Sequence, residues 1–140
     1  MNTALKCDFS LSSFCNLQKL VLGMLLPANL FREITESIAD PSKLKSLQFN
    51  ISRYYEEDCE PGIRVFLSQC CNLEDLSIKA AMDIYPDRPL MKLKKLILEP
   101  TVKYAEEVLS LRNFIQQQKE TLESLDLNIR IWVLSRKMEF

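Results

Sequence analysis

The chain has 140 residues, a formal net charge of −1 and 47% hydrophobic residues, which indicates a single folded domain of ordinary composition. This charge balance leaves no basic field for a nucleic acid and no polybasic patch for a membrane, so we expect neither as a partner. The sequence has no histidine and only two glycines, which excludes histidine-based catalysis, HExxH zinc sites and glycine-rich phosphate loops.

In chain order, the first predicted element is a strand in residues 1–11, where Leu5, Cys7, Phe9 and Leu11 alternate. One phrase then recurs five times: a leucine, two polar residues, a leucine, a variable residue and an apolar residue. The copies are CNLQKLVL (15–22), SKLKSLQF (42–49), CNLEDLSI (71–78), MKLKKLIL (91–98) and ETLESLDL (120–127). Each copy predicts one short strand, because its apolar residues point to one side and must be buried together.

Three of the segments between the phrases predict helices with one apolar face, because apolar residues recur at steps of three and four. These segments are 28–40 with Leu30, Ile34 and Ile38; 61–70 with Ile63, Phe66, Leu67 and Cys70; and 103–118 with Tyr104, Val108, Leu111 and Ile115. Prolines precede the first helix and open the second, and Pro41 stops the first. The interval 81–91 is short and contains two prolines, so it predicts a loop.

The recurring phrase resembles that of the leucine-rich repeat family, over about residues 14–134. The resemblance implies an α/β fold: a short leucine-rich-repeat solenoid with a curved parallel sheet on the inner face and helices and loops on the outer face. Residues 1–140 then form a single domain of about five repeats. Both ends are apolar, whereas terminal repeats need polar caps, so we expect a fragment, an isoform or a divergent copy of a longer protein. Such a chain is expected to be marginally stable or to self-associate in isolation.

The repeats lack the asparagine that follows each phrase in regular family members; Leu25, Ser52, Ala81, Thr101 and Arg130 stand there instead. This irregularity, with the segment FLSQCCNLEDLSI (66–78), is similar to the cysteine-containing intracellular type, which is common in F-box receptors of ubiquitin ligases. That similarity implies substrate recognition without catalysis. The alternative is a repeat segment of another intracellular receptor, such as a nucleotide-binding immune sensor.

The segment LPANLFREITESIADPSKLKSL (26–47) also resembles the F-box, whose leucines on two helices would offer an apolar face to a ubiquitin-ligase adaptor. The family's Val-Cys-x-x-Trp ending is missing downstream. The competing interpretation is a repeat helix followed by the next strand. The spacing of the repeats favours the latter.

Few residues of the sequence suggest catalysis or metal binding. The five cysteines (Cys7, Cys15, Cys59, Cys70 and Cys71) are odd in number and lack CxxC spacing, which favours packed thiols in a reducing, cytoplasmic or nuclear compartment over metal ligands. The acidic run from Glu56 to Glu60 is read as a solvated loop rather than a cation site. Trp132 is either a recognition anchor or a cap of the stack. We therefore expect no enzyme activity, no cofactor and no metal.

The expected binding surface is the concave face of the sheet, which solenoids use to bind other proteins. The predicted partner-binding residues are Lys19, Gln48, Asn50, Asp75, Ser77, Lys79, Lys95, Glu99, Asp126 and Asn128. Val21, Ser46, Ile97 and Ser124 share that face. The partner would be a protein, either a ligase substrate or a receptor ligand.

Overall fold

A computed structural model describes residues 16–23, 28–38, 40–50, 60–80, 84–86, 88–102 and 104–131. Four predictions lie outside these ranges: the strand in residues 1–11, the acidic run before Glu60, the tryptophan anchor Trp132 and the cysteines Cys7, Cys15 and Cys59.

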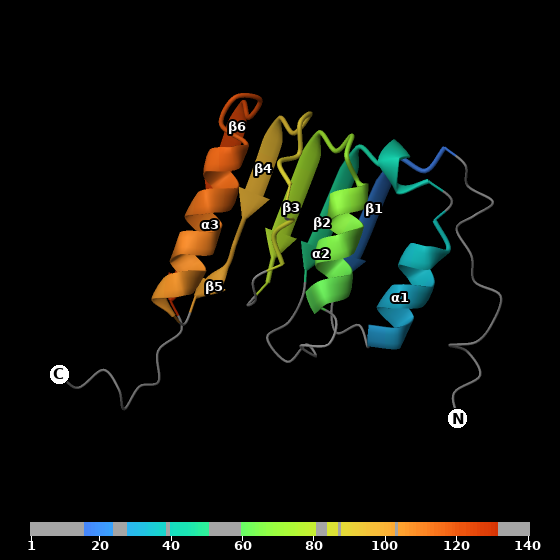
Figure 1. The fold of residues 1–140 in the computed structure, drawn as a ribbon, viewed down its shortest axis with the longest axis horizontal. Coiled ribbons are helices and arrows are strands. Elements are labelled where there is room, and N and C mark those ends of the chain that lie inside the picture. Colours follow the sequence, from blue (N-terminus) through green and yellow to red (C-terminus); the bar gives the residue numbers. More distant parts are fainter. Residues whose placement is uncertain are drawn as a thin grey trace.

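The described residues form a mixed α/β fold around a parallel sheet of five strands, in the order β1-β2-β3-β4-β6 (Figure 1). The strands are β1 (Lys19–Gly23), β2 (Ser46–Asn50), β3 (Asp75–Lys79), β4 (Lys95–Leu98) and β6 (Ser124–Leu127). Each strand is one of the five predicted phrases, and phrases that follow one another in sequence are neighbours in the sheet. The predicted α/β class and parallel sheet are therefore confirmed.

All four strand pairs share one register, in which equivalent positions of the phrase lie opposite each other. Leu20, Leu47, Leu76, Leu96 and Leu125 form one continuous row across the sheet. A slip by one residue would move a strand's leucines to the other face. Burial of Leu47, Leu76 and Leu96 therefore fixes the register in the middle of the sheet.

Helices cover one side of this sheet (Figure 1). They are α1 (Ala28–Glu36), the short 3-10 helix η2 (Pro41–Lys43), α2 (Glu60–Gln69) and α3 (Ala105–Gln117). A second, two-stranded parallel sheet joins β5 (Thr101–Val102) to β7 (Arg130–Ile131), just beyond the ends of β4 and β6.

Helix α1 is shorter than the predicted 28–40, because it ends at Glu36. Pro41 keeps Asp40 out of the helix, because a proline restricts the residue before it to an extended backbone. Asp40 has φ −146° and ψ 94°, and it caps η2 by accepting hydrogen bonds from the Ser42 amide (3.1 Å) and the Ser42 hydroxyl. These hydrogen bonds lower the pKa of the Asp40 carboxyl, and the one from the Ser42 hydroxyl has the larger effect.

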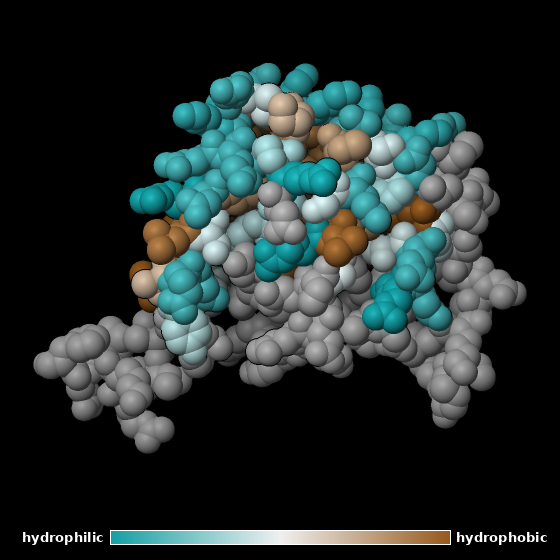
Figure 2. All heavy atoms as spheres, in the orientation of Figure 1, coloured by the Kyte–Doolittle hydropathy of each residue, from teal (hydrophilic) through white to brown (hydrophobic). Residues whose placement is uncertain are grey.

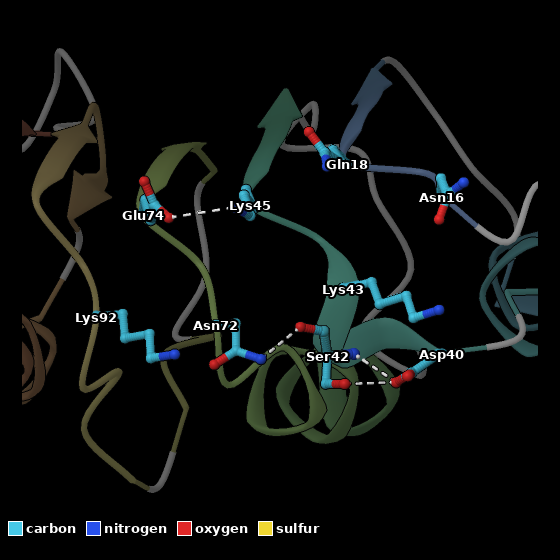
Figure 3. A pocket seen from close by; sticks show the side chains of 9 residues that line it. All are labelled: Asn16, Gln18, Asp40, Ser42, Lys43, Lys45, Asn72, Glu74 and Lys92. Carbon is cyan, nitrogen blue, oxygen red and sulfur yellow. Dashed lines mark hydrogen bonds and ion pairs between the residues drawn. The ribbon is translucent and has the colours of Figure 1, made fainter.

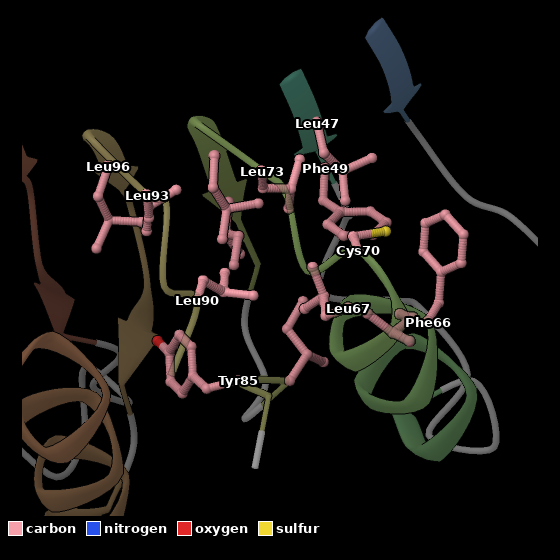
Figure 4. Packing of buried hydrophobic residues seen from close by; sticks show 14 of the residues in the cluster. Leu47, Phe49, Phe66, Leu67, Cys70, Leu73, Tyr85, Leu90, Leu93 and Leu96 are labelled. Carbon is pink, nitrogen blue, oxygen red and sulfur yellow. The ribbon is translucent and has the colours of Figure 1, made fainter. Parts of the chain in front are cut away.

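The core lies between the sheet and the helices, and Figure 4 shows part of it. Each of β2, β3 and β4 contributes two inward side chains, and all are at most 3% exposed: Leu47, Phe49, Leu76, Ile78, Leu96 and Leu98. The predicted apolar face of α2, Ile63, Phe66 and Leu67 together with Cys70 just after the helix, is buried against them. The interior therefore follows the repeated phrase closely.

The predicted loop lies before β4, in the interval where the other pairs of neighbouring strands are connected through a helix. Ile84, Tyr85 and Leu90 are buried there without a helix or strand of their own. The Tyr85 ring stacks on Phe114 of α3, with ring centroids 5.0 Å apart and planes 16° apart. Gln118, which follows α3, accepts a hydrogen bond from the Leu90 amide through its side-chain oxygen (3.0 Å). The short interval between β3 and β4 thus still closes the core.

The predicted apolar face of the third helix is partly wrong. Tyr104 and Val108 are 61% and 44% exposed, whereas Leu111 and Phe114 are buried. Only the second half of α3 reaches the buried loop and the core, because Phe114 stacks there on Tyr85. The first half of α3 is left with little to pack against in the described chain.

Candidate functional site

The side of the sheet away from the helices carries the predicted binding residues, and we call it the open face. It consists of the side chains that alternate with the buried leucines along each strand. Exposure follows this alternation: Leu47 and Phe49 on β2 are buried, whereas Gln48 and Asn50 are exposed. Strand β3 repeats the pattern with buried Leu76 and Ile78. The open face is therefore free of helical cover among the described residues.

All ten predicted binding residues fall on the open face or on its direct continuation. Lys19, Gln48, Asn50, Asp75, Lys79, Lys95, Asp126 and Asn128 are exposed, and Ser77 and Glu99 are half-buried. Glu99 and Asn128 directly follow β4 and β6 rather than lying in them. These residues come from all five phrases and are far apart in the sequence. The sheet brings them together on one surface.

The open face carries charges of both signs. Lys19, Ser46, Asp75, Lys95 and Ser124 form one row, in which Asp75 lies opposite Lys95. A second row contains Val21, Gln48, Ser77, Ile97 and Asp126. The Glu99 carboxylate also lies 3.8 Å from the Arg130 guanidinium. The open face is therefore a mixture of both charges, amides and a few apolar groups, with Val21 51% exposed, and not a field of one sign.

A row of polar residues precedes the strands, and we call it the rim: Gln18, Lys45, Glu74, Lys94 and Glu123. The backbone repeats one arrangement along it, because the carbonyls of Gln18, Lys45, Glu74 and Lys94 each accept hydrogen bonds from two consecutive amides of the next repeat. The Glu74 carbonyl, for example, accepts from the Lys94 and Lys95 amides at 2.8 and 2.9 Å. From Lys45 onward the side-chain charges alternate in sign, and Lys45 and Glu74 form an ion pair at 3.9 Å.

Next to the rim, the surface contains a hollow with a volume of about 370 Å³. Polar and charged residues line the hollow (Figure 3): Asn16, Gln18, Asp40, Ser42, Lys43, Lys45, Asn72, Glu74 and Lys92. The Asn72 side-chain amide donates to the Ser42 carbonyl (2.8 Å) and so ties two neighbouring repeats together. Sequence reasoning missed this hollow, because it is formed by the starts of several repeats and no single motif marks it.

The adjacent cysteines occupy different environments. Cys70 is fully buried beneath α2, whereas Cys71 is exposed, which corrects the expectation that both are packed. Burial, and secondarily the neighbouring thiol of Cys71, raises the pKa of the Cys70 thiol to about 12. Cys70 is therefore a core side chain and not a nucleophile.

Within the described ranges, no group of three or more acidic or cysteine side chains is placed to hold a metal ion. None of the helices described is long and apolar enough to cross a membrane. The segment that resembles an F-box contains α1 and η2, but Leu47 lies on strand β2 and not on a second helix. This arrangement agrees with a repeat helix followed by the next strand.

No protein-family model matches the chain. No curated protein and no solved structure shows significant similarity to it either. The function must therefore be argued from the residues of the open face.

Proposed function

We propose that this chain is a non-catalytic recognition module of the leucine-rich-repeat type, which binds another protein on the open face. One observation carries the proposal: the sheet buries one side against the helices and leaves the other uncovered across the described strands. Parallel sheets usually have both faces covered. A parallel sheet with one exposed polar face is therefore a surface kept available for binding.

The composition of the open face supports a protein as the partner. Its charges are of both signs, so neither a polyanion nor a polycation matches it as a whole. Exposed Val21 and half-buried Ile97 add apolar contact area among hydrogen-bonding side chains such as Gln48 and Asn50. We infer that the module acts in the cytoplasm or nucleus, where its cysteines stay reduced.

The type of partner follows from the cysteine-containing resemblance of residues 66–78. Helix α2 ends at Gln69, and buried Cys70 lies just before the turn into β3, which is the order that the cysteine-containing repeats show. On this basis we propose that the partner is a substrate of an F-box ubiquitin ligase. The resemblance supports this assignment, and the open face supplies the contact surface.

A photo-crosslinking amino acid at Gln48 should capture a protein from lysate, whereas the same group at Arg112, exposed on α3, should not. Lys79→Glu on the open face should reduce capture at least tenfold. Arg112→Glu is the matched control, since it makes the same change of charge on the helical side. Equal capture from both positions, or capture insensitive to Lys79→Glu, would contradict the proposal.

A further inference from the structure

Strand β6 forms one edge of the described five-stranded sheet. Leu125 and Leu127 occupy the same inward positions as Leu96 and Leu98 of β4, but they are 43% and 39% exposed where the β4 residues are fully buried. At the same end of the sheet, Val108 and Leu109 of α3 and Ile129, which follows β6, are also exposed. Figure 2 shows hydrophobic atoms along the outer side of α3, at the left of the view, on a mainly hydrophilic surface. An apolar patch therefore lies along this end.

The backbone at this end is arranged to accept another parallel strand. The Ser124 and Asn128 amides point toward β4, where they donate to the Lys94 and Leu98 carbonyls. By alternation, the amides of Leu125 and Leu127 point to the outer edge. The Glu123 carbonyl is the next acceptor in the rim series, and no amide of the described residues donates to it. This edge repeats, in position and direction, the edge that β4 presents to β6.

The charges of the rim indicate which side chain would suit a strand added at this edge. Glu74 lies between Lys45 and Lys94, and its carboxylate pairs with Lys45 at 3.9 Å. Glu123 has Lys94 on one side only, and Asp126 on the open face adds a second carboxylate at this end. A lysine or arginine in the rim position of an added strand would continue the alternation.

We propose that the β6 edge binds a strand of another polypeptide, in parallel and in register, with a basic residue in the rim position and leucines at the inward positions. The leucines cover Leu125 and Leu127, and the basic residue faces Glu123. A second copy of this chain fits less well, because its β1 carries uncharged Gln18 in the rim position. This edge is separate from the open face, so the proposal does not depend on the recognition function above.

Two synthetic peptides from the chain's own repeats provide probes whose rim residues have opposite charge. Residues 41–50 (PSKLKSLQFN) carry Lys45 in the rim position, and residues 119–128 (KETLESLDLN) carry Glu123 there. The full chain should bind the first peptide at least tenfold more tightly than the second, measured by fluorescence anisotropy. Glu123→Lys should reverse the preference. Glu120→Lys, a nearby exposed site outside the rim, should leave it unchanged.

Hydrogen exchange measured by NMR gives an independent readout that does not rely on a variant. The first peptide should slow exchange of the Leu125 and Leu127 amides, which face the outer edge. Equal binding of the two peptides, or no slowing at these amides with millimolar peptide, would overturn the proposal. So would a dimer of the chain alone in sedimentation that Leu127→Asn dissociates, because the occupant would then be a second copy.

Discussion

At the scale of single residues, two adjacent cysteines are separated by burial. The Cys70 thiol is buried and has its pKa raised to about 12, whereas Cys71 is exposed. Because thiolates react and thiols do not, iodoacetamide at pH 8 should alkylate Cys71 and spare Cys70 until the chain unfolds. Tandem mass spectrometry of the tryptic peptide 65–79 separates the two sites, with Cys71→Ser as control. Equal labelling of the folded chain would contradict the burial of Cys70.

The same pKa shift makes stability depend on pH. In the unfolded chain the Cys70 thiol ionises near its ordinary value of 9.0, whereas in the folded chain it stays protonated up to about 12. The unfolded state therefore loses its proton first, so this residue's contribution to stability is complete below pH 9 and is lost as pH rises toward 12. Urea unfolding across this window should show a steeper fall for the natural chain than for Cys70→Ala. Parallel curves would refute the assignment.

Gln118 is a buried polar residue that no pattern in the sequence identifies. It is 1% exposed, its side-chain oxygen accepts from the Leu90 amide, and its Nε2 has no partner in the described structure. Gln118→Ala would leave the Leu90 N–H unsatisfied, at a cost of about 1–3 kcal/mol in the free energy of unfolding. Denaturant unfolding measures the loss, and Gln117→Ala, exposed one residue earlier, is the matched control.

At the scale of elements, equivalent leucines of the repeated phrase contribute unequally to the free energy of unfolding in different strands. Leu96 and Leu125 are direct neighbours in the register, yet Leu96 is fully buried and Leu125 is 43% exposed. Leu96→Ala should lower the free energy of unfolding by about 2–5 kcal/mol, because it leaves a cavity. Leu125→Ala should cost less than half as much. Chemical denaturation compares the two, and equal losses would mean that the end of the sheet is covered in solution.

The strands and their register could be predicted from the sequence because one phrase recurs with its leucines in fixed places. Helix α2 was equally predictable, since Ile63, Phe66 and Leu67 within it and Cys70 just after it are all buried. The end of α1 was not, because the apolar spacing continues to Ile38 although the helix ends at Glu36. The first half of α3 follows the helical pattern, but none of the described residues covers its apolar side chains. A pattern of apolar residues does not show whether a neighbour exists.

The candidate site, like the fold, was only partly predictable from the sequence. The ten residues of the open face were predictable from strand alternation alone, since each lies at a fixed offset from a leucine. The rim hollow was not, because Asp40, Asn72 and Lys92 come from three repeats and meet only through the stacking of repeats. Nothing in the individual phrases distinguishes the last one as exposed. Its exposure follows from its place at the edge of the described sheet.

At the scale of the whole molecule, that order implies a gradient of local stability. Strand β3 has a paired strand on each side and inward residues at most 3% exposed, whereas β6 is paired on one side only in the described sheet and all its residues are exposed. Because stability in stacked repeats is a sum of nearest-neighbour terms, β6 should open without the rest of the sheet. Native-state hydrogen exchange should find the β3 amides protected at close to the global free energy of unfolding, and those of β6 protected far less. Leu76→Ala should then lower protection in β2, β3 and β4 together, whereas Leu125→Ala should lower it in β6 alone. Uniform protection across the five strands would show instead that the sheet unfolds as one unit.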